Sequence, residues 1–150
     1  MGLTALWALV LVLFIAPPVR ADTEELELPS NTISLAVGLP LPVGGAISLE
    51  LLHRFDQRNF VMLGAGTAVL MSGGYLTYGR RLSPGVGSAW FFFTGVDTNY
   101  FSGFFGSEGV TLPGAHVGIG KEWFPGSFRL ALSLNTGFPW IAGLRFSVGR

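Results

Sequence analysis

One stretch of this chain alternates strictly between two kinds of side chain: Phe128-Arg129-Leu130-Ala131-Leu132-Ser133-Leu134-Asn135. Every even-numbered position holds a large apolar residue, and every odd-numbered position holds a small, polar or charged residue. Successive side chains of a β-strand point to opposite faces, so a period of two predicts a strand. One face of this strand is apolar throughout, while the other face suits a polar environment.

The same alternation recurs between turn signals along most of the chain. It predicts eight strands, at Thr32–Leu39, Ala46–Phe55, Phe60–Leu70, Tyr75–Leu82, Ala89–Thr98, Ala115–Phe124, Phe128–Asn135 and Ile141–Gly149. Strands of about 9 to 11 residues can cross a bilayer obliquely, and membrane barrels are apolar towards lipid and polar inside. We therefore expect an all-β fold, an eight-stranded antiparallel up-and-down transmembrane β-barrel, over residues 31–150.

The first thirty residues differ from the rest of the chain. Ala5 to Ala16 form an unbroken apolar run, and Val19-Arg20-Ala21 offers a cleavage site before Asp22. This run is too short for a spanning helix, which needs about 20 residues. Residues 1–21 are therefore predicted to be a cleaved signal peptide, with an uncleaved anchor as the alternative. Residues 22–30 are predicted to be an acidic periplasmic tether.

Composition excludes several classes of protein. Charged residues make up only 12% of the chain, about half the share of an ordinary soluble domain. Nine acidic and nine basic residues balance, so no nucleic-acid partner is expected. The chain has no cysteine, which excludes a disulfide scaffold, a thiolate metal site and a lipid-modified cysteine. Its two histidines, His53 and His116, have no metal-binding spacing, so neither a metal nor a cofactor is expected.

The charged residues of the strands fall on the face that also carries the glycines. This face would line the barrel interior, where we expect a network of Glu50, Arg54, Arg81, Asp97, Glu122, Arg129 and Arg145. Unpaired buried charges are costly, so the preferred interpretation is a salt-bridge network that fills the barrel. The alternative is an ion-selective constriction. A further hypothesis is that the acidic tether folds back over the basic residues as a plug.

Aromatic residues gather near the ends of the predicted strands. Such rings favour the headgroup level of a membrane, so we expect a girdle that contacts outer-membrane lipid, formed by Trp90, Trp123, Phe128 and Trp140. The connection Asn99–Gly114 is the only long one, and the even strand number places it opposite the chain ends. It is predicted to face outwards, as a lid or an adhesive tip, because bacterial barrels have short periplasmic turns.

Two other interpretations remain open. A soluble lipocalin-like barrel would turn the apolar face inwards around an apolar ligand. Phe91 and Phe93 on the small-residue face, and the unbroken run Phe60-Val61-Met62-Leu63, fit that interpretation better. A lipid-modifying barrel hydrolase would use His116, although no serine lies beside it in the sequence. No catalytic residue is assigned.

In its pattern of strands, the segment 31–150 resembles the small eight-stranded outer-membrane barrels of the OmpA/OmpX-like kind. In those proteins the last strand typically ends in an aromatic residue that follows alternating apolar positions. Here Leu144, Phe146 and Val148 keep that alternation, but Arg150 occupies the terminal position. The resemblance implies the outer membrane of a diderm bacterium and insertion by the barrel-assembly machinery. It implies no single activity and no particular partner, so the expected role is structural or in surface interaction.

Overall fold

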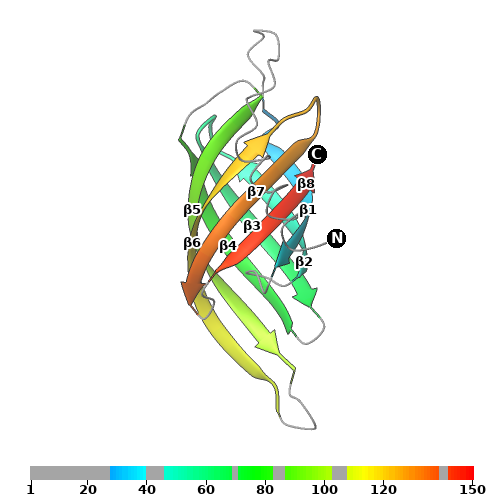
Figure 1. Cartoon of the computed structure of the whole chain (residues 1–150), viewed down its shortest axis with the longest axis vertical. Helices are drawn as coiled ribbons and strands as arrows, with labels where there is room; N and C mark the ends of the chain where they lie inside the picture. The colour runs from blue at the N-terminus through cyan, green and yellow to red at the C-terminus, as the bar shows by residue number, and fades with distance from the viewer. Residues whose placement is uncertain (1–27, 40–45, 69–70, 83–86, 103–107, 139–141) are drawn as a thin grey trace, which may run out of the picture.

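The computed structural model describes residues 28–39, 46–68, 71–82, 87–102, 108–138 and 142–150 (Figure 1). The predicted signal peptide, the part of the tether from residue 22 to 27, and Trp140 of the predicted girdle lie outside the described residues. Among the described residues, no helix is long and apolar enough to cross a membrane.

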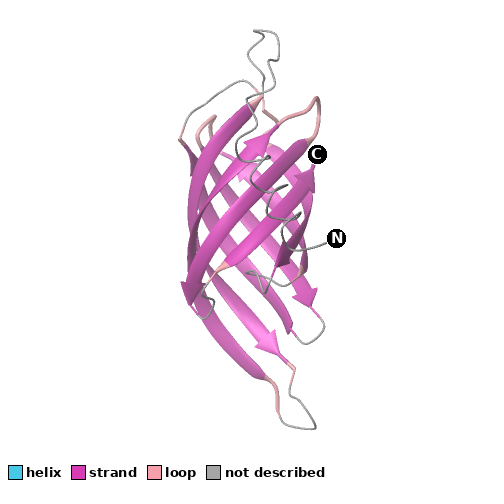
Figure 2. Ribbon diagram, in the orientation of Figure 1, coloured by secondary structure: helices cyan, strands magenta, loops and turns pink. Residues whose placement is uncertain are grey.

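Eight strands form one closed barrel (Figures 1 and 2). They are β1 (Asn31–Leu39), β2 (Ile47–Arg54), β3 (Asn59–Ala68), β4 (Met71–Arg81), β5 (Ser88–Phe101), β6 (Val110–Trp123), β7 (Arg129–Phe138) and β8 (Gly143–Gly149). Each strand pairs antiparallel with its neighbours in the sequence, and β1 pairs with β8 to close the barrel. The predicted all-β, eight-stranded up-and-down architecture is confirmed.

The last residue of the chain takes part in this closure. The backbone N–H and C=O groups of Arg150 each bond the opposite group of Ile33 at 3.0 Å. The Arg150 guanidinium lies 6.0 Å from the ring centroid of Phe128. Arg150 therefore extends the β1–β8 seam at the end of the barrel where β1 begins and β8 ends, which we call the terminal end.

Four predicted boundaries are wrong, and one of them is the end of β7, which was expected at Asn135 and lies at Phe138. Met71–Gly74 was expected to be a connection, but β4 begins at Met71. The long connection was expected to span Asn99–Gly114, but β5 runs to Phe101 and β6 starts at Val110. The β5–β6 hairpin reaches far towards the end opposite the C-terminus (Figure 1). At β4, β6 and β7 the cause is the same, because Gly73, Gly74, Gly114 and Gly137, which suggested turns, lie inside strands.

The tight turn between β2 and β3 has a clear local cause. The carboxylate of Asp56 accepts bonds from the backbone N–H groups of Arg58 and Asn59 and from the side-chain amide of Asn59, at 2.6 to 2.7 Å. These hydrogen bonds lower the pKa of the Asp56 carboxyl, and the bond from the Asn59 side chain has the largest effect. Asp56 thus fixes a turn at the terminal end by a mechanism common for aspartate in turns.

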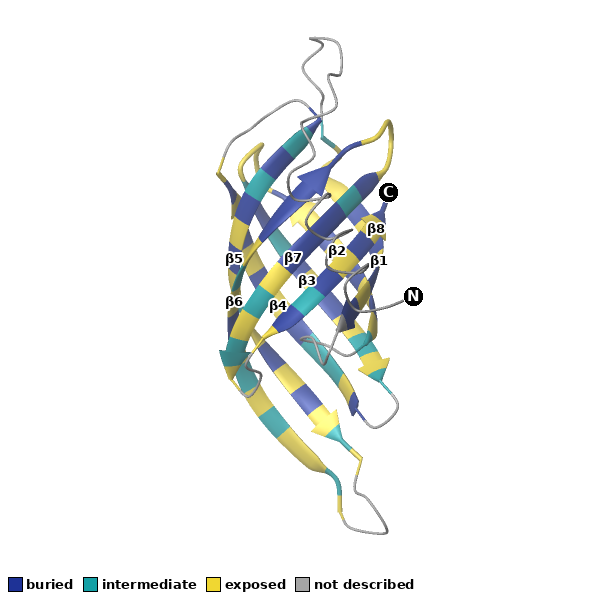
Figure 3. Ribbon diagram, in the orientation of Figure 1, coloured by how far each residue is buried: buried dark blue, intermediate teal, exposed yellow. Residues whose placement is uncertain are grey.

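Burial alternates along most of each strand, as the period of two requires (Figure 3). The exceptions are residues 120–123 on β6 and 131–133 on β7, where consecutive residues are buried. Leu35 on β1 is 56% exposed, whereas its neighbour Ser34 is 1% exposed. Large apolar side chains such as Ile47, Leu49 and Val96 cover the outside, while Glu50 and Glu122 are buried within. A lipocalin-like barrel requires the opposite arrangement, so the faces agree with the membrane interpretation.

Large rings fill the barrel by standing over glycines on neighbouring strands. Tyr75 lies opposite Gly64, and a Cβ atom on Gly64 would overlap the Tyr75 ring. The same relation joins Phe60 to Gly79, Phe91 to Gly120 and Phe93 to Gly118. An eight-stranded barrel is only wide enough for side chains, so a ring on one strand needs an empty position opposite. This explains why phenylalanines occur on the small-residue face.

Substitution of Gly64 by alanine tests this packing. We expect Gly64→Ala to lower the free energy of unfolding by about 1–3 kcal/mol, because the added methyl group displaces the Tyr75 ring. The measurement is urea unfolding of residues 22–150 refolded in detergent micelles. Gly74→Ala is the matched control, because a Cβ atom there would meet only the carbonyl oxygen of Gly64, at 3.5 Å. Equal losses in the two variants would contradict the packing account.

Candidate functional site

The polar side chains inside the barrel form three groups along its axis. The group nearest the terminal end is the arginine cluster, defined as Arg54, Arg81, Arg129 and Glu122. The central group contains Ser48, Glu50, Tyr75 and Arg145. The histidine group contains Thr77, Asp97, Asn99 and His116. All of these side chains are buried.

In the arginine cluster, three cations surround one carboxylate. Arg81 Nε lies 2.7 Å from Glu122 Oε1, and Arg129 Nε donates to Glu122 Oε2 at 2.9 Å. Arg54 is farther away, with its Nη2 atom 3.7 Å from the same oxygen. Glu122 is 1% exposed, so these cations offset the cost of burying a carboxylate.

Other contacts of the arginine cluster come from backbone and aromatic groups. Arg54 donates to the carbonyl of Pro29 at 2.8 Å, and Arg81 donates to the carbonyl of Gln57 at 3.0 Å. The ring of Phe124 lies 5.5 Å from both guanidinium groups. A guanidinium group stacks well on an aromatic ring, and it donates hydrogen bonds to carbonyl oxygens. Contacts with several strands and turns therefore hold the cluster in place.

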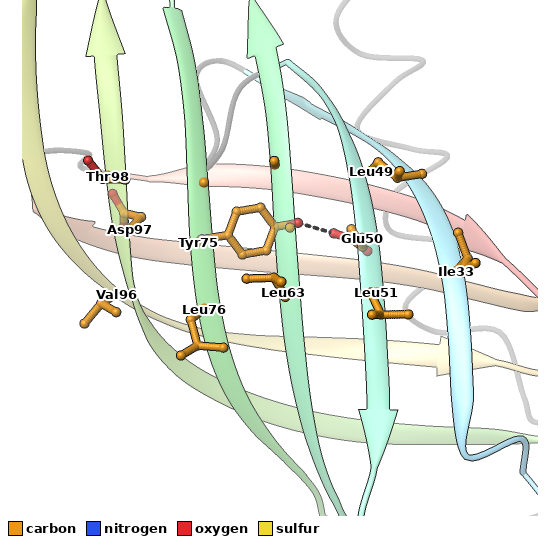
Figure 4. A pocket seen from close by; sticks show the side chains of 13 residues that line it. Ile33, Leu49, Glu50, Leu51, Leu63, Tyr75, Leu76, Val96, Asp97 and Thr98 are labelled. Atoms are coloured by element: carbon orange, nitrogen blue, oxygen red, sulfur yellow. Dashed lines mark hydrogen bonds between the residues drawn. The ribbon is translucent and has the colours of Figure 1, made fainter.

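The central group pairs one acid with one base. Arg145 Nε lies 2.9 Å from Glu50 Oε1, and the hydroxyl of Tyr75 donates to the same oxygen at 2.7 Å (Figure 4). Arg145 Nη2 donates to the hydroxyl of Ser48 at 2.7 Å and contacts the Tyr75 hydroxyl. Its guanidinium lies 4.4 Å from the centroid of the Tyr75 ring. These contacts bridge the interior between β2, β4 and β8.

The histidine group is a chain of hydrogen bonds. His116 Nδ1 lies 3.0 Å from Asp97 Oδ2, and His116 Nε2 lies 2.9 Å from the hydroxyl of Thr77. Asn99 donates to the second carboxylate oxygen of Asp97 at 2.6 Å. Since a carboxylate only accepts, the neutral imidazole carries its proton on Nδ1 and accepts from Thr77.

A hydroxyl, an imidazole and a carboxylate in this order also form the skeleton of a nucleophilic relay. Here Thr77 is 1% exposed, His116 4% and Asp97 6%, and all three project into the barrel. Their nearest large neighbours are rings, since Tyr75 and Phe93 lie 6.3 and 6.1 Å from the His116 ring. An acyl chain in the surrounding bilayer would not reach the Thr77 hydroxyl.

The sequence-based hypothesis treated the interior charges as one network. The structure brings Arg54, Arg81, Glu122 and Arg129 together and places Glu50 with Arg145 in a separate pair. Asp97 joins neither, because its partners are His116 and Asn99. Sequence reasoning did not include Tyr75 or Thr77 in the site. The available signal was the period of two, which places both on the same face as Arg81.

An apolar layer separates the arginine cluster from the central group. Along β2, Leu52 lies between Glu50 and Arg54 and is fully buried. It belongs to a buried cluster with Phe60, Met62, Tyr75, Phe91, Phe93 and Ala131. Ions cross a barrel only where water or polar groups replace their hydration shell. This layer therefore opposes a continuous pore through the described part of the chain.

At the terminal end, rings and cations lie together, with Phe128 exposed and with Lys121 and Trp123 buried at 6% and 9% exposure. Lys121 Nζ lies 5.7 Å from the Trp90 ring and 5.4 Å from the Trp123 ring. Phe128 is 50% exposed and carries Arg150 over its face. Three of the four residues predicted for the girdle thus lie at one end of the barrel, and the fourth, Trp140, is outside the described residues.

The outer wall also has a shallow groove of about 760 Å³ (Figure 4). It lies where small residues, among them Gly64, Ala65 and Gly74, thin the wall between β2 and β5. Leu49, Leu63 and Leu76 border it, so the groove is largely apolar. Its lining also includes Glu50, Tyr75 and Asp97, which are buried and belong to the groups described above, and Thr98. No cluster of metal-ligating side chains occurs among the described residues.

Removal of the Glu122 charge tests the electrostatics of the arginine cluster. We expect Glu122→Gln to destabilise the barrel by about 3–5 kcal/mol, because three buried cations would lose the one carboxylate that the described residues place among them. Urea unfolding in micelles measures this loss. The control is Glu108→Gln, since Glu108 is exposed beyond the other end of the barrel. If the two variants were equally stable, the cluster would be stabilised by something other than Glu122.

No protein-family model matches this sequence, and no curated protein is detectably similar to it. The solved N-terminal β-barrel domain of OprF from Pseudomonas aeruginosa is similar in fold, with a TM-score of 0.62 and 16% sequence identity. The match covers 82% of this chain and 98% of the OprF domain. The outer-membrane protein Ail of Yersinia pestis, solved in a phospholipid bilayer nanodisc, gives a TM-score of 0.52 at 14% identity, covering 79% of this chain and 96% of Ail. The chain therefore has the fold of the small eight-stranded outer-membrane β-barrels.

Proposed function

We propose that this chain spans the outer membrane of a diderm bacterium and serves a structural or surface-interaction role, with at most a narrow pore. The observation that carries the proposal is that charged side chains are buried inside the barrel while large apolar side chains are exposed on its outside, the opposite of a soluble protein. Glu50 and Glu122 are 1% exposed, whereas Leu49 is 61% exposed and Ile33 60%. Such a barrel is stable where its outside meets hydrocarbon and its charges meet one another.

In this proposal the terminal end faces the periplasm. The described turn at residues 55–58 there is short, while the β5–β6 hairpin extends from the opposite end. Short periplasmic turns and longer outer segments are the rule in bacterial barrels. The β5–β6 hairpin would then be the part of the molecule best placed to meet an extracellular partner. Phe128 and the half-buried Trp90 would contact lipid at the periplasmic headgroup level, whereas Trp123, at 9% exposure, is buried beside Lys121.

The proposal also covers how the chain is exported and inserted into the outer membrane. Residues 1–21 would direct the chain across the inner membrane, and the barrel-assembly machinery would insert it. The outward residues Leu144, Phe146 and Val148 of β8 offer the alternating apolar signal, with Phe146 in the role of the aromatic residue. Arg150 pairs with Ile33 at the seam and is thereby part of the ladder that insertion must close.

A second candidate function is lipid hydrolysis. The distances from Thr77 to His116 and from His116 to Asp97 favour it, because they match a nucleophile, a base and an orienting acid. The burial of all three residues opposes it. The structural role is therefore the better supported of the two.

The location is tested by fractionation of cells that express the tagged protein, with gel migration of boiled and unboiled samples. We expect the protein in the outer-membrane fraction, with a shift in migration on boiling, because a closed barrel resists detergent until heated. A soluble protein with no shift would contradict the proposal.

Catalysis is tested with the purified protein in mixed micelles of phospholipid or lipopolysaccharide. We expect no fatty-acid release that depends on His116, because the Thr77 hydroxyl is enclosed by the barrel. His53→Ala is the matched control for His116→Ala, since His53 is exposed and bonds Asn31 on the outside. Hydrolysis that is lost in His116→Ala and kept in His53→Ala would favour the hydrolase instead.

A further inference from the structure

The arginine cluster holds more positive charge than its own carboxylate neutralises. Arg54, Arg81 and Arg129 are 7%, 3% and 3% exposed, and Glu122 is the one carboxylate that the described residues place among them. In the central group, by contrast, one acid faces one base. Buried charges need partners of opposite sign, so the surplus of cations calls for an anion.

Buried hydrogen-bond donors of the cluster also have no acceptor among the described residues. They are Nε and Nη2 of Arg54 and Nη2 of Arg81. Arg54 Nη2 lies 3.7 Å from Glu122 Oε2, which is close enough for an ion pair but too far for a hydrogen bond. Buried donors of native proteins are almost always bonded, to protein, water or a ligand. These donors therefore call for an acceptor that the described part of the chain does not supply.

The donors without an acceptor belong to two neighbouring guanidinium groups that are already held in place. Arg54 and Arg81 both contact the carboxylate of Glu122, and each guanidinium lies 5.5 Å from the centroid of the Phe124 ring. A backbone carbonyl accepts a hydrogen bond from Nη1 of each arginine. Two oriented guanidinium groups present forked donors, which is the arrangement that recognises the oxygens of phosphate and carboxylate groups.

The position of the cluster determines from which side a ligand arrives. The carbonyls that hold it belong to Pro29, just before β1, and to Gln57, in the turn between β2 and β3, so it lies at the terminal end. On its other side, the fully buried Leu52 separates it from the central group. A ligand would therefore reach the arginines from the aqueous phase at the terminal end, while the barrel wall separates them from acyl chains.

We propose that Arg54, Arg81 and Arg129 form a binding site for a soluble phosphate compound, either inorganic phosphate or a phosphomonoester. Three arginines against one glutamate leave a surplus of two positive charges. A phosphomonoester carries about −1.5 to −2 charges at pH 7 and offers three strong acceptor oxygens, so it matches both the charge and the donors. A phosphodiester, with about one charge, matches them less well.

A lipid headgroup that ends in a phosphomonoester, such as phosphatidic acid, has the same chemistry. Its phosphate lies in the bilayer outside the barrel wall, whereas the arginine side chains are buried within. The site is therefore assigned to the soluble compound, and it does not depend on the role proposed above.

The first experiment observes the arginine side chains directly. The Nε–Hε resonances of Arg54, Arg81 and Arg145 are followed by NMR on residues 22–150 in micelles, while inorganic phosphate replaces chloride at constant ionic strength. We expect saturable shifts for Arg54 and Arg81 and none for Arg145, which lies beyond the apolar layer. The absence of a saturable shift would show that water satisfies the donors. Equal shifts of all three resonances would show a general effect of the ions. Either result would overturn the proposal.

The second experiment changes the donors and keeps the charge. Arg54→Lys retains a cation but loses the forked Nε and Nη2 donors, so we expect it to bind phosphate about ten-fold more weakly, as read from the Arg81 resonance. The matched control is Arg80→Gln, because Arg80 is the exposed neighbour of Arg81 on the outside of the barrel. We expect its affinity to be unchanged. Equal weakening in the two variants would show long-range attraction in place of a site.

The third experiment separates the chemical class and the source of the ligand. Methyl phosphate and dimethyl phosphate are titrated in the same way, and phosphatidic acid is added to the micelles in a separate sample. We expect methyl phosphate to bind as inorganic phosphate does, dimethyl phosphate to bind several-fold more weakly, and phosphatidic acid to leave the Arg54 resonance in place. If phosphatidic acid moved this resonance and methyl phosphate did not, the ligand would be a lipid headgroup and the soluble assignment would be wrong.

Discussion

The narrowness of an eight-stranded barrel is the constraint on which the rest of this structure depends. Its interior admits side chains but little else, so each large ring inside requires a glycine on the neighbouring strand. Tyr75 over Gly64 and Phe93 over Gly118 are two such pairs. The glycines are thus spacers that determine where rings and charges fit, and the arrangement leaves a packed core where a wider barrel would hold water.

The buried charges follow from the same constraint. Because no bulk water separates them, each must find a partner across the interior. Two sets of ion pairs provide these partners: Glu50 pairs with Arg145, and Glu122 pairs with Arg81 and Arg129. Both sets connect strands that are distant in the sequence. Such pairs favour one register of closure over others, since a shift by one residue would turn the charges towards lipid.

The period of two was sufficient to predict the strands and the faces of residues such as Glu50 and Leu49. It also led to errors at Met71 and Val110, because glycine in a strand and glycine in a turn look alike in a sequence. The grouping of the interior charges was not predictable in the same way. Contacts across a barrel depend on strand tilt and stagger, which place Asp97 beside His116. None of the ion pairs of the described residues joins Asp97 to an arginine. Phe91 and Phe93 seemed to favour a soluble barrel until their opposite glycines explained them.

The central claim, that the apolar face meets lipid and the glycine face is enclosed, is tested most directly at two neighbouring residues. Phe92 is 39% exposed on the outside and Phe93 is 6% exposed within. Single tryptophans are introduced as Phe92→Trp and Phe93→Trp in a mature protein whose Trp90, Trp123 and Trp140 are replaced by phenylalanine. Fluorescence is then measured in vesicles of brominated phospholipid, which quenches tryptophan on contact. The account predicts strong quenching for Phe92→Trp and little for Phe93→Trp. Equal quenching, or the reverse order, would contradict it.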